Sequence, residues 1–319
     1  MSNANIHGLD HNSNDNNNNN NIYRVQQYDM NSNESIFSKF MYKGEPREQT
    51  IRSYLKEAIY PFLFLKSFSF AVIILNVVMY IVSLCIHGLD NYEKYYSFLP
   101  PSSTTLDLLG NLYGYKMRVY PVQFYRWITH NFLHANFAHV FSNCFCILMF
   151  GTMLEYLIGT WRYVLIYLLS GLLGGLFSVL IKPGVSSVGA SICCYGAIAA
   201  ILGFDIINWN YITVIYGTQN KCLILMIPLL MILFTLPMTL TIGGTTFSLN
   251  NRVNFFGHLG GIIFGLLLSF CIIKPKDPSD SSSKVNKILF YCGIVSCAIF
   301  GLTGFLCFYL MNKYMGTII

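Results

Sequence analysis

Repeated apolar runs constrain this chain more than any other feature of its sequence. A helix that crosses a bilayer needs about 20 predominantly apolar residues. Seven runs of this kind predict seven transmembrane helices, at residues 67–86, 137–158, 163–181, 188–207, 222–242, 255–273 and 288–311. We therefore expect an all-α membrane protein in which the second to sixth spans, joined by short loops, form a compact bundle.

The composition excludes other classes of protein. Hydrophobic residues make up 54% of the chain and charged residues only 11%, whereas a soluble domain has about 25% charged residues. The net charge of +6 is modest, and the basic residues stand beside apolar runs, so nucleic acid is not an expected partner. The ten cysteines lie in or beside apolar segments and predict small buried side chains rather than disulfides or a zinc site.

The apolar runs also divide the chain into domains. Residues 1–60 are polar and contain an Asn run from Asn16 to Asn21, which predicts a disordered tail. No signal peptide is expected, because the first apolar run comes late and is too long for one. Residues 61–274 hold six spans and a long first loop at 88–136, and residues 275–319 hold a linker and the seventh span.

Basic residues orient the predicted spans. Thirteen Lys and Arg residues lie on the side of the N-terminal tail and seven on the other side. Because cytoplasmic loops carry the excess of such residues, we expect a cytosolic N-terminus and an extracytoplasmic C-terminus. The even-numbered spans then start at the extracytoplasmic face.

A serine among small residues, in the stretch 189–200, is the first candidate for chemistry. Ser191 can simply bond a carbonyl or a neighbouring helix, as most membrane serines do. However, His139, Ser191 and His258 each stand near the start of an even-numbered span, about 5 Å inside it at 1.5 Å per residue. Ionisable groups are costly within a membrane, so this shared layer indicates a functional site.

These residue types suit nucleophilic catalysis. A serine needs a base within hydrogen-bond reach, and His258 is the candidate. Gly257, Gly261 and Gly265 form a ridge of small residues that lets the sixth span press against the fourth. Tyr195, one turn after Ser191, can stack on the imidazole. No carboxylate is expected in this layer, so the sequence predicts a Ser191–His258 dyad.

A tetrahedral intermediate also requires hydrogen-bond donors for its oxyanion. His139 and Asn143 are four residues apart and share one helical face, so both can point at one spot. The backbone N–H of Ser191, at the positive end of a helix, is a third candidate donor.

A metal site is the alternative interpretation of the histidines. His130 and His134 have the spacing of a helical i, i+4 pair, and His139 follows. Because no carboxylate or further ligand stands nearby, we expect no metal, and we expect His134 and Arg126 to brace the first loop instead.

Taken together, the motifs resemble those of the rhomboid intramembrane serine proteases over residues 120–273. The motifs are Tyr125-Arg126-Trp127, then Phe132-Leu133-His134 followed by His139, Asn143, Glu155 and Gly159, then Gly189-Ala190-Ser191 with Tyr195-Gly196, and finally His258-Leu259-Gly260-Gly261. Ile192 departs from the resemblance, because the family has glycine there, and a branched side chain is expected to crowd the oxyanion or the substrate. Gly257 replaces the family's usual alanine.

The resemblance implies a fold of six helices plus one C-terminal helix, as in the secretase-type branch of the family. It implies Ser191 as nucleophile, His258 as general base, and His139 and Asn143 as oxyanion donors, supported by Tyr195, Gly189, Gly257 and Gly261. The implied substrates are single-pass membrane proteins cleaved without metal or cofactor, in the plasma membrane or secretory pathway. A catalytically silent relative that binds client spans, and a small transporter, are the alternatives.

Overall fold

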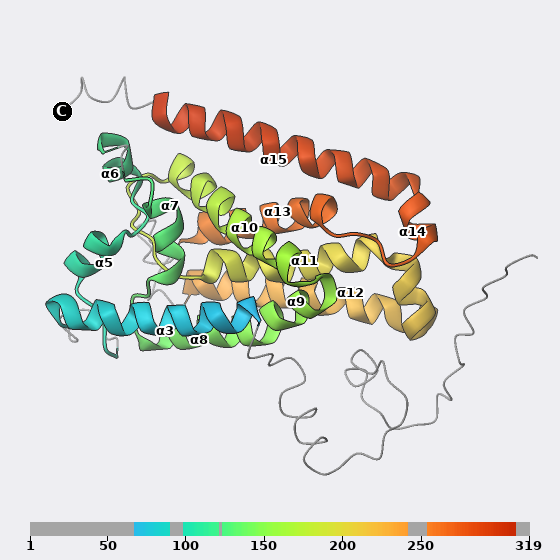
Figure 1. Ribbon diagram of the computed structural model, residues 1–319, viewed down its shortest axis with the longest axis horizontal. Helices are drawn as coiled ribbons and strands as arrows, with labels where there is room; N and C mark the ends of the chain where they lie inside the picture. The colour runs from blue at the N-terminus through green and yellow to red at the C-terminus, as the bar shows by residue number, and fades with distance from the viewer. Residues whose placement is uncertain (1–66, 90–97, 121–122, 242–253, 311–319) are drawn as a thin grey trace, which may run out of the picture. The chain divides into compact units, whose positions relative to one another are not determined.

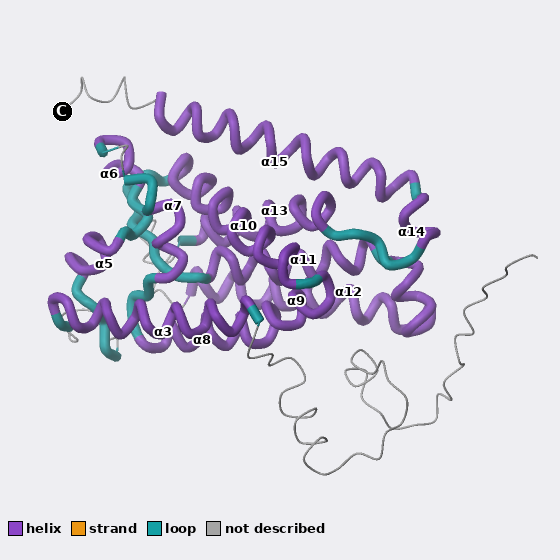
Figure 2. Tube along the Cα trace, in the orientation of Figure 1, coloured by secondary structure: helices purple, strands orange, loops and turns teal. Residues whose placement is uncertain are grey.

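The computed structural model describes residues 67–89, 98–120, 123–241 and 254–310. Figure 2 shows helices joined by loops throughout this part of the chain, in which no β-strand is assigned apart from two isolated bridges. The predicted N-terminal tail lies outside the described residues. The all-α class expected from the sequence is confirmed.

The long helices begin and end close to the predicted spans. They are α3 (Phe68–His87), α8 (Phe137–Cys146) continued through η2 (Ile147–Gly151) into α9 (Thr152–Ile158), α10 (Thr160–Ile181), α11 (Ser191–Ile207), α12 (Trp209–Thr241), α13 (Phe255–Ile272) and α15 (Lys284–Leu310). Shorter helices are α5 (Ser103–Leu109), α6 (Gly114–Val119), α7 (Arg126–Thr129), η1 (His130–Phe132) and α14 (Pro278–Ser282).

Five of the seven predicted spans appear as helices long and apolar enough to cross a membrane, counting only the described residues: α3, the α8–α9 helix, α10, α13 and α15. The predicted fourth span is the shorter apolar helix α11, of 17 residues. The predicted fifth span lies in α12, where residues 224–233 form a shorter apolar stretch. The protein is therefore a multi-pass membrane protein, and the count of seven spans remains a prediction.

Two helices begin at other residues than the spans predicted for them. The fourth span was expected from residue 188, but α11 begins at Ser191, because Gly189 has φ +121° and cannot continue a right-handed helix. The fifth was expected from residue 222, but α12 begins at Trp209. Residues 209–221 contain no proline that would break a helix. Their polar residues delay the start of the apolar run to residue 222, but the helix already begins at Trp209.

Close glycine contacts hold α10, α11 and α13 together at the centre of Figure 1. A Cβ added at Gly265 of α13 would lie 2.3 Å from the backbone oxygen of Gly196 in α11. A Cβ at Gly196 would lie 2.2 Å from Oγ of Ser170 in α10. Such backbone approach is available only to glycine, so these residues fix the distances between the three helices.

The second span contains a turn of π-helix at Ile147–Gly151. Such a turn accommodates one residue more than an α-helical turn. It brings Gly151 against α10, where an added Cβ would meet the hydroxyl of Tyr163 at 2.4 Å. The sequence pattern gave no signal for it.

Glu155 joins the start of α3 to the end of the second span. Its carboxyl oxygens accept hydrogen bonds from the backbone N–H of Phe68 at 2.9 Å and of Ser69 at 2.9 Å. The hydroxyls of Ser69 and Thr160 donate to it at 2.7 and 2.8 Å. Glu155 thus satisfies N–H groups that a helix start leaves without partners.

We expect Glu155→Ala to destabilise the fold by about 2 kcal/mol, the upper range for loss of a helix cap, because buried N–H groups lose their acceptor. Thermal unfolding in detergent measures this loss. Glu155→Gln, which keeps one acceptor oxygen, should lose less, and equal stability of Glu155→Ala and the wild type would contradict the assignment.

The outer helices of the bundle meet at the end of α15. The indole N–H of Trp127 in α7 donates to the hydroxyl of Tyr309 at 3.1 Å, and the guanidinium of Arg118 in α6 lies 4.9 Å from the ring centre of Phe308. The predicted long first loop therefore contains short helices that pack on the last long helix.

Candidate active site

Three helix starts converge on Ser191. It is the first residue of α11, His258 is in the first turn of α13, and His139 is in the first turn of α8. Oγ of Ser191 lies 2.7 Å from Nε2 of His258, which is hydrogen-bond distance. The structure thus brings together the two side chains from which the sequence predicted a dyad.

The imidazole of His258 packs against Tyr195. The two ring centres are 4.7 Å apart and the rings are tilted by 36°. His258 is only 5% exposed, and its Nδ1 has no hydrogen-bond partner among the described residues. Ring packing, rather than a carboxylate, therefore orients this imidazole in the described part of the chain.

His139 and Asn143 border the backbone two residues before Ser191. A Cβ added at Gly189 would lie 2.6 Å from Nε2 of His139 and 3.2 Å from Nδ2 of Asn143. Both polar atoms therefore face the same short stretch of backbone. Only a glycine fits there, both because of this approach and because of its positive φ.

Two N–H groups at this position are available as donors. Nδ1 of His139 lies 3.5 Å from the backbone N–H of Ala135, so a neutral ring that accepts this long hydrogen bond carries its proton on Nε2. Nδ2 of Asn143 is buried and has no acceptor among the described residues. In addition, Ala190 at the N-cap position gives α11 no side-chain cap, so the helix start also presents N–H groups.

The side chain of Ile192, the residue after Ser191, lies between helices. It is 1% exposed and packs against α10 and α13, where it meets Gly174, Gly257 and Gly261. The first turn of α11 thus directs this side chain into the contact between helices, and the expected crowding of an oxyanion or substrate stays a prediction.

Sequence reasoning missed Asn254, which fixes the start of α13. Its Oδ1 accepts from the N–H of Gly257 at 2.8 Å and from the hydroxyl of Ser178 in α10 at 2.6 Å. An asparagine four residues before His258 is the N-cap signal that predicts this role.

His130 and His134 do not form a helical pair, because η1 ends at Phe132 and Leu133 is extended. Both histidines are fully buried, and burial lowers the pKa of each to about 3. They are therefore neutral near pH 7. His134 packs edge-on against the ring of His139, a candidate oxyanion donor, with 5.2 Å between the ring centres.

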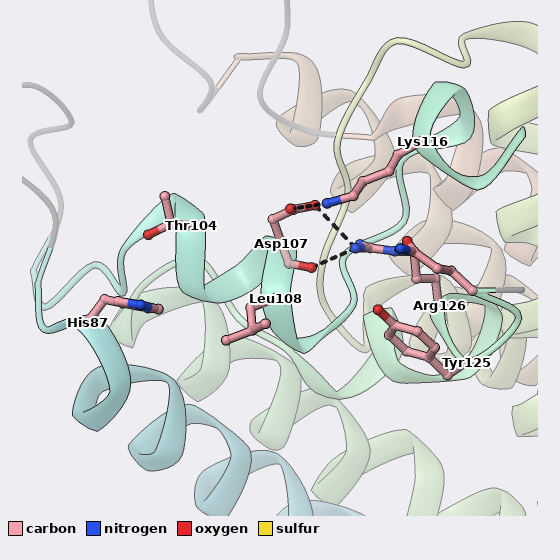
Figure 3. A pocket seen from close by; sticks show the side chains of 8 residues that line it. His87, Thr104, Asp107, Leu108, Lys116, Tyr125 and Arg126 are labelled. Carbon is pink, nitrogen blue, oxygen red and sulfur yellow. Dashed lines mark hydrogen bonds and ion pairs between the residues drawn. The ribbon is translucent and has the colours of Figure 1, made fainter. Parts of the chain in front are cut away.

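Arg126 braces the first loop, as predicted. Its guanidinium donates to Asn111 O at 2.9 Å, to Asn111 Oδ1 at 2.6 Å and to Asp107 O at 2.7 Å, and it lies 3.3 Å from the carboxylate of Asp107. Asp107 also pairs with Lys116. Asp107, Lys116 and Arg126 line a pocket, shown in Figure 3, whose lining includes neither Ser191 nor His258. Its volume is about 400 Å³.

The fold and this geometry define a multi-pass membrane protein in which a half-buried serine lies at hydrogen-bond distance from a buried histidine, and comparison with known proteins gives the family. Residues 121–275 match the family described as Rhomboid domain. The chain belongs to the rhomboid family.

The names of the curated relatives differ in the activity that they state. The chain is 36% identical over 176 residues to RHOMBOID-like protein 6, mitochondrial, of Arabidopsis thaliana, covering 55% of this chain and 52% of the relative. It is 29% identical over 255 residues to Rhomboid-like protease 3 of Toxoplasma gondii, covering 79% and 85%. It is also 31% identical over 171 residues to Inactive RHOMBOID-like protein 8 of Arabidopsis thaliana, covering 52% and 42%.

The chain spans about half the length of several curated relatives that it matches, for example 52% of RHOMBOID-like protein 6, and 64% of RHOMBOID-like protein 7 of Arabidopsis thaliana. The family includes both proteases and proteins named as inactive, so membership alone does not assign an activity.

Proposed function

We propose that this protein is an intramembrane serine endopeptidase that cleaves transmembrane helices of single-pass membrane proteins. Ser191 is the nucleophile and His258 the general base. The observation that carries the proposal is the 2.7 Å separation of Ser191 Oγ and His258 Nε2 within a helical bundle. A base at this distance activates an otherwise weak nucleophile.

The reaction follows from these two groups. Nε2 of His258 takes the proton of Ser191 as Oγ attacks the carbonyl carbon of the scissile peptide bond. The tetrahedral intermediate collapses when His258 returns this proton to the leaving amine, which releases one fragment and leaves an acyl-enzyme. Water then attacks the ester carbonyl while His258 takes its proton. His258 passes this proton to Oγ of Ser191 as the acyl C–O bond breaks, which releases the second fragment as a carboxylic acid and restores Ser191.

The N–H groups around Gly189 stabilise the negative oxygen of the intermediate. His139 Nε2 and Asn143 Nδ2 border this site from α8, and the start of α11 adds the N–H of Ser191. Donors that are in place before the reaction lower its barrier without reorganisation.

The substrate must present an extended backbone. An α-helix engages its peptide carbonyls in hydrogen bonds, so cleavage requires local unwinding, which glycine and proline in the substrate span favour. In the orientation expected from the basic residues, the N-terminus is cytosolic and the helix starts with Ser191 and His258 are extracytoplasmic, so cleavage releases an ectodomain. The proposed reaction uses no cofactor.

Asn143→Ala should lower kcat by about 10² to 10³, the loss measured when one oxyanion donor is removed. Cleavage of a reporter span in proteoliposomes measures kcat. KM should change little, since the donor acts on the intermediate. A loss confined to KM would assign Asn143 to substrate binding instead.

A catalytically silent protein that binds client spans is the second candidate. The relative named as inactive favours it. The presence of both Ser191 and His258, at hydrogen-bond distance, favours the protease.

Two measurements on the purified full chain separate the candidates. A fluorophosphonate probe in detergent should label the wild type at Ser191, and reconstitution with a panel of single-pass spans should yield cleaved products. Absence of both labelling and cleavage, while the protein still retains client spans, would assign the silent function.

A further inference from the structure

The residue after Ser191 occupies a site between two other helices. Ile192 is 1% exposed, and its side chain and carbonyl contact three glycines, one from α10 and two from α13. We call Gly174, Gly257 and Gly261 the Ile192 socket.

Each glycine of the socket is required by a different atom of Ile192. An added Cβ at Gly174 would lie 2.6 Å from Ile192 Cγ2, one at Gly257 would lie 2.8 Å from Ile192 Cδ1, and one at Gly261 would lie 2.3 Å from the Ile192 carbonyl oxygen. Real Cβ contacts are essentially never this short, so the neighbouring groups would have to move.

The socket joins the immediate chain neighbours of the two reacting side chains. Ile192 follows Ser191, and Gly257 precedes His258. The contact between them therefore lies one residue from each member of the pair whose reacting atoms are 2.7 Å apart. A displacement of α13 at Gly257 necessarily moves His258 relative to Ser191.

Hydrogen bonds of Asn254 restrict how the start of α13 could shift to accommodate a larger residue at position 257. Asn254 holds it to Ser178 of α10 at 2.6 Å and to the N–H of Gly257 at 2.8 Å. A Cβ at Gly257 would also lie 2.7 Å from Nδ2 of Asn254. Position 257 is thus enclosed on two sides, by α11 and by the cap of its own helix.

We propose that Ile192 and Gly257 are a matched pair of positioning residues that sets the distance between Ser191 and His258. The pair acts through packing and does not touch substrate. This inference rests on the proposed protease function.

The test is a double-mutant cycle on the full chain in proteoliposomes. Gly257→Ala adds the conflicting methyl group, Ile192→Val removes Cδ1, and the double variant combines both. We expect Gly257→Ala to lower kcat about tenfold to 10²-fold, because small misplacements of reacting groups have effects of this size. KM should change much less. The double variant should recover a substantial part of kcat.

Gly301→Ala in α15 is the matched control, because its added Cβ would lie 3.6 Å from Leu173 Cδ2, an ordinary contact. It should retain wild-type kcat. The rate of fluorophosphonate labelling, measured on folded protein isolated by size exclusion, reports the geometry of Ser191 and His258 independently of substrate. It should fall in Gly257→Ala and rise again in the double variant.

The outcomes separate this inference from the protease function. If the wild type neither cleaves nor labels, the proposed function fails. If the wild type is active and Gly257→Ala matches Gly301→Ala in kcat and labelling rate, the function stands and the positioning role is overturned. A loss in Gly257→Ala that Ile192→Val does not relieve also overturns it, because the conflict would then lie with Asn254.

Discussion

Ser191→Ala and His258→Ala should each lower kcat for a reporter span by a factor of about 10⁵ or more, as removal of a nucleophile or its base does in serine hydrolases. The reason is that Ser191 supplies the attacking oxygen and His258 is the group that lies 2.7 Å from it. Reporter cleavage in proteoliposomes, normalised to folded protein, measures the effect.

The two losses should not add. Once either partner is absent the other has no role in attack, so the double variant should be about as slow as each single one. Gly301→Ala in α15 is the control, because its added Cβ would make only an ordinary contact, 3.6 Å from Leu173 Cδ2. Cleavage above about a hundredth of the wild-type rate in either single variant would require a different nucleophile or base.

Ile192→Gly should destabilise the protein by about 4 kcal/mol, without raising turnover. The change removes a 1% exposed side chain that fills the Ile192 socket, and deleting a buried isoleucine side chain costs about 2–5 kcal/mol, with about 1 more for glycine in a helix. Because the side chain packs against glycines of α10 and α13, we expect its removal to leave a cavity between helices rather than to relieve crowding at the donors.

Denaturation in detergent measures this loss, and reporter cleavage measures the turnover. Ile192→Val, which removes one methyl group, should cost only about 1 kcal/mol. Unchanged stability together with faster cleavage would show instead that Ile192 restrains the reaction.

The apolar runs predicted the helix ends well where a run and its helix begin and end at the same residues. The second span was predicted at 137–158, and the helices from Phe137 to Ile158 occupy those residues. This correspondence fails for α12, because its first 13 residues are too polar to belong to the predicted apolar run but are still helical. Hydropathy reports the environment of a segment, whereas hydrogen bonding along the backbone decides where the helix stops.

The site was predictable because its residues share one position within their helices. His139, Ser191 and His258 all stand at helix starts, and the orientation predicted from the basic residues puts these three starts on the same side. The packing of Ile192 was not predictable, because whether a residue next to Ser191 faces a donor or a neighbouring helix depends on the angle at which α11 begins. Gly189, with its positive φ, sets that angle.

The π-helical turn at Ile147–Gly151 carries one residue beyond the α-helical repeat, midway between Asn143 and Glu155. One residue of an α-helix corresponds to about 100° of rotation. The turn therefore determines the rotation about the helix axis between Asn143, on the half near Ser191, and Glu155, on the half that binds the start of α3. A homologue lacking it would need its anchoring carboxylate one place nearer the asparagine, so sequence alignments through this span should carry a single-residue gap.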